Sequence, residues 1–462
     1  MIQEDLDLLS KEELIRMILE QAKELAQLKA DNEALKLKLD QIQKRPPTTS
    51  KNSSQPPSKD QKSDQPKDRR KHRHGPPPGH EKHERKFVAQ ADKVVKLRVK
   101  SCSLCHTDLS AEEGRLVKAN QITELPEAKA EVIEVRQYET TCPQCGHGQV
   151  EEPPVGLEME RTFGARLEAT VVYYRQEQHM SYERTQLALL NLHGVEISQG
   201  GIDGIMQRAG EKAIQAAKPI EETVRQSAVI HSDETSSRVG GDNWWEWVFC
   251  TAKAVLHVIR FNRSEDVIKD VMDRVKAEVW ESDCYSAQLK APAGQLQLCL
   301  AHQLRNLQAV VDADPTLTWL RAMQVLFRYA IHLHHQRNQF SPDQFAAQVA
   351  RVERHCDRLL QRSLAPPDAK RLQRRYLKHR QKLFVFLYRT DVAPTHNVAE
   401  RALRPSVVHR KVIGCFRSEW GAQAYAALAS VIDTAELSGI RAFDAIQSLF
   451  GSPSLPLPVG GE

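Results

Sequence analysis

Three carboxylates from distant parts of the sequence have the residue types that metal-dependent phosphoryl transfer requires. Asp233 lies in a strand-like run, Asp283 ends a second such run, and Glu400 lies in the first turn of a helix that is otherwise neutral or basic. Carboxylate oxygens bind hard divalent cations, and two such cations can activate a nucleophile and stabilise the leaving oxygen at phosphorus. Taken alone, Glu400 is better explained as a surface residue paired with Arg404 one turn later. The hypothesis therefore depends on the fold that joins the three.

Strands are the elements that would position the two aspartates. Runs rich in β-branched and aromatic residues predict strands at 229–239, 244–251, 255–261 and 279–283. The Gly-Gly-Asp-Asn sequence at 240–243 predicts a hairpin turn, and Ser264 is expected to cap a helix that runs to about Ala277. Three antiparallel strands, a helix and a further strand form the order in which a ribonuclease-H-like fold begins.

Helices are predicted between Asp283 and Glu400. Residues 300–382 show few strand signals, and the apolar run 383–387 then predicts a short strand before the helix of Glu400. Arg371 and Arg375 share one helical face with two lysines, in a run without acidic residues. This face is either a track for phosphates or an ordinary solvated surface, and both interpretations stay open.

The helix of Glu400 also carries candidate phosphate contacts. Asn397 lies one turn before Glu400 on the same face, where it would orient the carboxylate or a phosphate. The basic residues that follow, with no acid from 401 to 418, include Arg401, Arg404, Arg410 and Lys411. Cations that flank a metal–carboxylate site suit a polyanionic substrate.

Two Cys-x-x-Cys pairs, Cys102/Cys105 and Cys142/Cys145, predict one structural zinc ion held by four thiolates. The apolar alternation at 132–135 suggests strands between the pairs, and hence a zinc ribbon. The first pair is followed by His, so it also matches the attachment string of c-type haem, and a redox pair is a further alternative. Two pairs favour zinc, because haem would leave the second pair unexplained.

The N-terminal segment predicts a coiled coil. Apolar residues recur at heptad a and d positions from Leu14 to Ile42, and Asn32 at an a position is a device that fixes register in parallel dimers. We expect self-association through residues 10–43. The alternative is a single amphipathic helix that packs on its own domain.

The charge of the chain is concentrated after this helix. Residues 44–100 contain 17 Lys and Arg against 6 Asp and Glu, in a chain of 462 residues whose net charge is +5. The Pro-, Ser- and Lys-rich part at 44–86 cannot bury enough apolar surface to fold. It is either a solvated linker or a non-specific phosphate contact. No apolar run is long enough to span a membrane and no signal peptide begins the chain, so we expect a cytoplasmic protein.

Residues 162–215 have a helical pattern. An amphipathic helix at 182–192 is followed by a Gly-containing turn, and Ser198 is then expected to cap a second helix towards Ala209. This order is typical of a helix-turn-helix, although glycines weaken the second helix. An ordinary helical hairpin fits the same pattern.

Several of these motifs together resemble the transposases of the insertion sequence 66 family, over nearly the whole chain. The matching stretches are Ser-Ser-Gln-Pro-Pro-Ser at 53–58, the four cysteines, His-Ser-Asp-Glu-Thr at 231–235, Ser-Asp-Cys-Tyr at 282–285, Cys-Leu-Ala-His at 299–302, and Asn-Val-Ala-Glu-Arg-Ala-Leu-Arg-Pro at 397–405. The family's acidic triad falls on Asp233, Asp283 and Glu400, with two Mg²⁺ ions implied. Ser232 and His396 depart from the commoner family residues, and we expect no loss of chemistry from either.

The resemblance implies a bacterial DNA transposase that binds the terminal inverted repeats of a mobile element and transfers strands to target DNA. Small accessory proteins of the same element are implied partners. It also accounts for the 117 residues between Asp283 and Glu400 as a helical insertion. Two alternatives remain: a zinc-dependent DNA-binding regulator with an inactive ribonuclease-H-like core, and a host nuclease of ribonuclease-H type.

The predicted fold class is multidomain α+β. The expected parts are a coiled coil (1–43), a basic disordered linker (44–90), a zinc-binding domain (91–155), a helical, helix-turn-helix-like DNA-binding region (156–222), a ribonuclease-H-like catalytic core (223–435) with a helical insertion at about 303–382, and a C-terminal tail (436–462).

Overall fold

The computed structural model describes residues 10–43, 86–154 and 156–451. Most of the predicted basic linker, the stretch at 53–58 and the last eleven residues of the predicted tail lie outside these ranges. The chain divides into two units by its internal contacts. One comprises 1–61, 133–187 and 196–462, and the other comprises 62–132 and 188–195. Each unit is described by itself.

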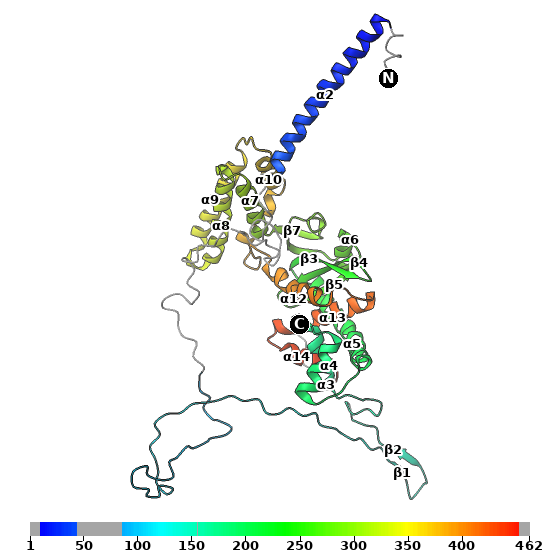
Figure 1. Ribbon diagram of the computed structural model, residues 1–462, viewed down its shortest axis with the longest axis vertical. Helices are drawn as coiled ribbons and strands as arrows, with labels where there is room; N and C mark the ends of the chain where they lie inside the picture. The colour runs from blue at the N-terminus through cyan, green and yellow to red at the C-terminus, as the bar shows by residue number, and fades with distance from the viewer. Residues whose placement is uncertain (1–9, 44–85, 155, 452–462) are drawn as a thin grey trace. The chain divides into compact units, whose positions relative to one another are not determined.

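A five-stranded mixed sheet is the centre of the larger unit (Figure 1). Its strands, in the order β5-β4-β3-β6-β7, are β5 (Val255–Arg260), β4 (Asp242–Cys250), β3 (Val229–Val239), β6 (Ala277–Ser282) and β7 (Ala293–Leu298). The first three are antiparallel, whereas β6 runs parallel to β3 and β7 parallel to β6. The four predicted strands are confirmed to within two residues at each end, and β7 was not predicted.

Local signals explain the turns between these strands. Gly240 and Gly241 have φ values of 60° and 94°, which a glycine adopts without strain, and they connect β3 to β4. The Ser264 side chain accepts a hydrogen bond from the Asp266 backbone and caps α6 (Glu265–Met272) as predicted. This helix ends before Ala277, because Asp273 adopts the left-handed conformation with a φ of 40°.

Two C-terminal helices pack against the sheet. Ala399 and Leu403 of α12 (Asn397–Ile413) form a buried cluster with Val248 and Cys250 of β4. The next helix, α13 (Glu419–Leu437), is largely buried and packs on β5. These contacts fix the rotation of α12 about its axis, and therefore the direction in which its polar side chains project.

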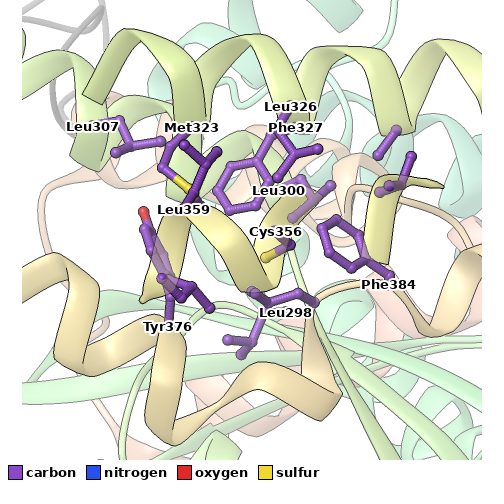
Figure 2. Packing of buried hydrophobic residues seen from close by; sticks show 14 of the residues in the cluster. Leu298, Leu300, Leu307, Met323, Leu326, Phe327, Cys356, Leu359, Tyr376 and Phe384 are labelled. Atoms are coloured by element: carbon purple, nitrogen blue, oxygen red, sulfur yellow. The ribbon is translucent and has the colours of Figure 1, made fainter. Parts of the chain in front are cut away.

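A group of helices between β7 and α12 shares a core with the edge of the sheet. Its members are α7 (Leu300–Ala313), α8 (Thr318–His335), α9 (Pro342–Leu360), α10 (Pro367–Lys378), α11 (Val385–Tyr388) and the short 3₁₀ turns η3 (Arg337–Gln339) and η4 (Arg380–Lys382). Leu298 of β7 lies in the same cluster as Phe327, Cys356 and Tyr376 (Figure 2). The helical region is therefore packed onto the sheet through a continuous apolar core.

The strand predicted at Leu383–Leu387 is wrong. Val385–Tyr388 form the short helix α11, and all five residues of the apolar run are buried in the shared core. The Phe386 backbone N–H donates to the side-chain oxygen of Gln297, 3.3 Å away, and this bond ties α11 to β7. A short apolar run fits a buried strand or a buried helix equally well, so packing decides between them.

Three helices precede the sheet: α3 (Ala165–Gln176), α4 (Tyr182–His193) and α5 (Gln199–Arg225). The Ser198 hydroxyl accepts a hydrogen bond from the Gly201 backbone and caps α5, as predicted. The helix continues well beyond Ala209, because its apolar face packs along α13. A Cβ on Gly210 would lie 2.7 Å from the Cβ of Ala424, so glycine permits this close approach.

The N-terminal helix α2 (Lys11–Gln43) leaves apolar side chains in solvent. Leu25 is 57% exposed and Leu28 is 65% exposed. Further along the chain, β1 (Glu139–Thr141) and β2 (Gly148–Val150) form a hairpin around the second Cys-x-x-Cys pair. The strands suggested at 132–135 are absent, since these residues have no regular structure.

The chain is a multidomain α+β protein with a mixed sheet. Within the described ranges, no helix has both the length and the apolar character needed to cross a membrane.

Candidate active site

Strand register brings the two aspartates to the same part of the sheet. His231 of β3 is paired with Glu281 of the parallel strand β6. Continuing this register by two residues sets Asp283, just past the end of β6, beside Asp233. Adjacent strands lie about 4.8 Å apart, so the two carboxylates belong to one site.

Two backbone hydrogen bonds hold the start of α7 next to Asp283 and next to the segment that leads into α12. The N–H of Cys299 donates to the carbonyl of Ser282 at 2.9 Å, directly before Asp283. The N–H of Leu300 donates to the carbonyl of Pro394 at 3.0 Å. The first turn of α7 therefore lies beside the stretch that leads into α12, whose first turn carries Glu400.

His396 lies between the first and third carboxylates. Its Nε2 atom is 3.6 Å from Oδ2 of Asp233 and 3.8 Å from Oε1 of Glu400. The His396 side chain is fully buried. The structure therefore brings Asp233 and Glu400 close to one imidazole nitrogen. His396, which differs from the residue more common in the family, is part of the candidate site.

Two α7 residues contact Glu400 directly. The Nη2 of Arg305 donates to Oε1 of Glu400 at 2.9 Å, and the Nδ1 of His302 is 3.6 Å from the same oxygen. The expected pair between Glu400 and Arg404 is not among the ion pairs of the described residues, and Arg404 is exposed. In the sequence, His302 stands out only as part of the Cys-Leu-Ala-His motif, and no local signal marks Arg305.

A separate network supports Asp283. Its Oδ1 accepts a hydrogen bond of 2.7 Å from the backbone N–H of Tyr285. The Tyr285 hydroxyl donates to the carbonyl of Arg263, whose guanidinium stacks on the Tyr285 ring. Arg263 also donates two hydrogen bonds to Oε1 of Glu234. Glu234 thus faces Arg263.

The electrostatics of the site reflect crowded negative charge. Burial and the neighbouring charge of Asp233 raise the pKa of Asp283 above its usual value. Burial, with the charges of Asp283 and Asp233, raises the pKa of Glu234 to about 7. Burial alone would raise the pKa of Asp233, but its contact with His396 outweighs that effect and lowers the pKa. Partly buried carboxylates that repel one another are stabilised by a divalent cation.

The two Cys-x-x-Cys pairs have the same backbone geometry. In each, the N–H of the first cysteine, Cys102 or Cys142, bonds to the carbonyl five residues on, and its own carbonyl accepts from the N–H four residues on. The residue after the second cysteine, His106 or Gly146, has a positive φ of 60° or 73°. A hydrogen bond from the Thr107 hydroxyl lowers the pKa of Cys105 to about 7. Each turn therefore suits two thiolates that bind one metal ion.

The two pairs fall in different units of the chain, Cys102 and Cys105 in the smaller and Cys142 and Cys145 in the larger. Each pair by itself offers two thiols to a metal ion. In each unit, the two thiols and the tight turn around them suit zinc binding.

The predicted phosphate-binding residues are on the surface of the larger unit. Asn397, Arg401 and Arg404 of α12 are exposed, as is Lys411, whereas Arg410 donates to the Ser236 hydroxyl at 3.0 Å. On α10, Arg371 and Arg375 line a hollow of about 510 Å³. Cys284 and Ser286, which follow Asp283, line the same hollow, so the basic face of α10 opens beside the candidate active site.

Acidic side chains from separate elements that approach one buried histidine suit an enzyme that uses a divalent metal, and comparison with known families identifies the group. The model of the family described as "Transposase IS66 family" matches residues 160–424. The chain belongs to this transposase family, for which DNA is the partner and divalent metal the cofactor. Residues 6–86 match a family of unknown function, DUF6444. No curated protein matches the chain.

Proposed function

We propose that the protein cuts DNA at the terminal inverted repeats of an insertion sequence and joins the freed 3′ ends to target DNA. The observation that supports this most strongly is the meeting of Asp233 and Glu400 at His396, with Asp283 beside Asp233 by strand register. The strand order is β5-β4-β3-β6-β7, in which β5, β4 and β3 are antiparallel and β6 and β7 run parallel to β3. This order supports a ribonuclease-H-like core. In this core the helices between β7 and α12 are the predicted insertion.

Asp233, Asp283 and Glu400 are the residues that would hold two Mg²⁺ ions. When bound, the ions supply Lewis acidity for the nucleophile and for the leaving oxygen. The protein's own part is geometric. Arg305 donates a hydrogen bond to Glu400, and the backbone N–H of Tyr285 donates one to Asp283. These hydrogen bonds orient the two carboxylates before DNA binds. Such pre-organisation favours in-line displacement at phosphorus.

DNA recognition is assigned to the surfaces around this site. The basic hollow of α10 and the exposed arginines of α12 suit phosphate contacts, because Lys and Arg neutralise the backbone without regard to sequence. The zinc-binding pairs and the helical region at 156–222 are the candidates for recognition of the element ends. Zn²⁺ held by the cysteine pairs would fix the turns that carry them.

Self-association would bring two element ends together. The exposed Leu25 and Leu28 of α2 occupy adjacent a and d positions, as a helix that pairs with a second copy requires. We propose that α2 forms this contact between protomers, and that each protomer contributes one carboxylate site.

The decisive experiment is Mg²⁺-dependent nicking of DNA that carries the element ends. We expect cleavage by the wild type, a loss on the order of 100-fold or more for Glu400→Gln, and unchanged binding of the ends. Glu419→Gln, which alters an exposed first-turn glutamate on α13, should cleave normally. A wild type that binds ends but never nicks or joins would instead indicate a DNA-binding regulator with an inactive core. Cleavage confined to RNA–DNA hybrids would indicate a host nuclease.

A further inference from the structure

A thiol and two imidazoles form a cluster next to the three carboxylates. The Sγ of Cys299 and one ring nitrogen each of His302 and His396 all lie within 4.8 Å of one another. Cys299 comes just before α7, His302 lies in the first turn of α7, and His396 is the N-cap of α12. Among the described residues, this is the one group of three or more potential metal-binding side chains at such short range.

The hydrogen bonding of the cluster is incomplete, although it is buried. Cys299 and His396 have no exposed surface. Neither ring nitrogen of His396 has a hydrogen-bond partner among the described residues, and the buried Nδ1 of His302 has none. Nε2 of His396 and Nδ1 of His302 each lie 3.6 Å from a carboxylate oxygen. A buried polar atom without a partner is unfavourable, so the unsatisfied Nδ1 of His396 points to a missing ligand rather than to packing alone.

We infer that Cys299, His302 and His396 bind a transition-metal ion, Zn²⁺ in the first instance, at a site separate from the magnesium carboxylates. One thiolate and two imidazoles are ligands that zinc prefers and that Mg²⁺ does not. Ligands of a tetrahedral zinc ion lie roughly 3.4 Å apart, so small side-chain rotations bring the three donor atoms to bonding distance. Binding displaces the Cys299 thiol proton and any proton on the coordinating nitrogens.

Asp233 and Glu400 face the ring nitrogens of His396 and His302 that would not bind the metal. His396 turns Nε2 towards Asp233, and His302 turns Nδ1 towards Glu400. A histidine that binds metal through one nitrogen usually donates its other N–H to a carboxylate, which fixes the ring. The ion would therefore take Nδ1 of His396 and Nε2 of His302. It would fasten α7 to α12 and orient Asp233 and Glu400 through the two rings.

This inference rests on the cluster geometry and not on the proposed reaction, so binding is its first test. The test protein is the full chain with Cys102, Cys105, Cys142 and Cys145 changed to Ser, titrated with Co²⁺. We expect one Co²⁺ per chain with a thiolate-to-cobalt absorption band. Adding Cys299→Ser should abolish the band, and adding Cys415→Ser should leave it unchanged. A folded test protein without the band, or a band that survives Cys299→Ser, overturns the inference.

A second measurement uses the chain with all its cysteines, in case the fourfold variant does not fold. Metal analysis of His396→Asn should show about one zinc per chain less than the wild type, with an unchanged circular dichroism spectrum. His332→Asn, which alters an exposed histidine of α8, should keep the wild-type zinc content. Equal zinc in His396→Asn and the wild type would show that His396 is only a buried counter-ion of Asp233.

Discussion

Arg305 donates a 2.9 Å hydrogen bond to Glu400 from a residue 95 positions earlier in the chain. The two side chains are both about one-quarter exposed, and they belong to different helices, α7 and α12. A charge-assisted bond between separate elements restricts a carboxylate more than an exposed pair within one helix, which is worth only tenths of a kcal/mol. Arg305 is therefore a positioning residue for Glu400.

Arg305→Ala is expected to lower DNA cleavage on the order of 10–100-fold, as loss of a partner that orients a metal ligand usually does. Binding of DNA ends should change little, because Arg305 faces the carboxylate. Arg404→Ala, on the exposed side of α12, should instead weaken end binding and leave the cleavage rate of bound DNA intact. Single-turnover cleavage and gel-shift titrations measure the two effects. Identical profiles for the two variants would contradict the distinction, and Arg305→Lys should recover part of the rate.

The hollow beside Asp283 predicts a salt-dependent effect. Changing Arg371 and Arg375 together to Ala should weaken DNA binding equally for end and non-end sequences. The slope of log K against log salt should fall by about two, one for each phosphate that the variant no longer neutralises. Arg380→Ala is the matched control, since Arg380 is already paired with Glu353 and Asp357. An unchanged slope in the double variant would show that this face is merely solvated.

A buried histidine on β5 predicts how stability depends on pH. His257 contacts Glu246 and Asp433 at 3.0 Å each. Burial opposes the charge of His257, but these two carboxylates outweigh it and raise the pKa to about 9. The unfolded pKa is about 6.5, so the stabilisation is complete below about pH 6.5 and is lost as the pH rises through 9.

Thermal unfolding at several pH values measures this effect. The wild type should lose up to about 1.4 kcal/mol of unfolding free energy per pH unit between pH 7 and 9 from this group. His257→Gln should be less stable at pH 7 and should show a flatter profile over the same interval. His332→Gln should follow the wild type. A His257→Gln profile parallel to the wild type would mean that His257 is neutral in the folded protein.

Self-association through α2 predicts a change in mass. Leu28→Lys places a charge at a d position and should convert the dimer to a monomer in sedimentation equilibrium. Ala30→Lys, two residues later on the outer face of the same heptad, should remain dimeric. If the two variants and the wild type have the same mass, the contact between protomers lies elsewhere in the chain.

The central strands could be predicted because their sequences carry local signals. Val229–Val239 and Asp242–Cys250 are long, rich in β-branched and aromatic residues, and separated by two glycines. Strand β7 has none of these features. It is short and contains Gly294, where a Cβ would lie 3.1 Å from the carbonyl oxygen of Glu278 in β6. Glycine is required there by a neighbouring backbone, and the sequence of the strand alone does not reveal that neighbour.

In the candidate site, too, some features could be predicted from the sequence and others could not. The positions of Asp233, Asp283 and Glu400 follow from the family motifs, and strand register accounts for the approach of the first two. The partners of Glu400 do not follow, because the pairing of Arg305 with Glu400 depends on the bond between Leu300 and Pro394. His396 was expected to be neutral for the chemistry, and its burial between two carboxylates is a consequence of tertiary packing that spacing does not encode.

The inserted helices that share a core with β7 also determine when the three carboxylates can come together during synthesis. A chain that grows from its N-terminus acquires Asp233 and Asp283 long before Glu400, which follows Asp283 by 117 residues. The helices that share a core with Leu298 lie between Asp283 and Glu400 in the sequence. A chain truncated before residue 400 would keep α2 and the start of the sheet but lack a complete carboxylate set. If α2 pairs two protomers as proposed, such a fragment would occupy a partner without cutting, and a prematurely ended product would inhibit its own full-length form.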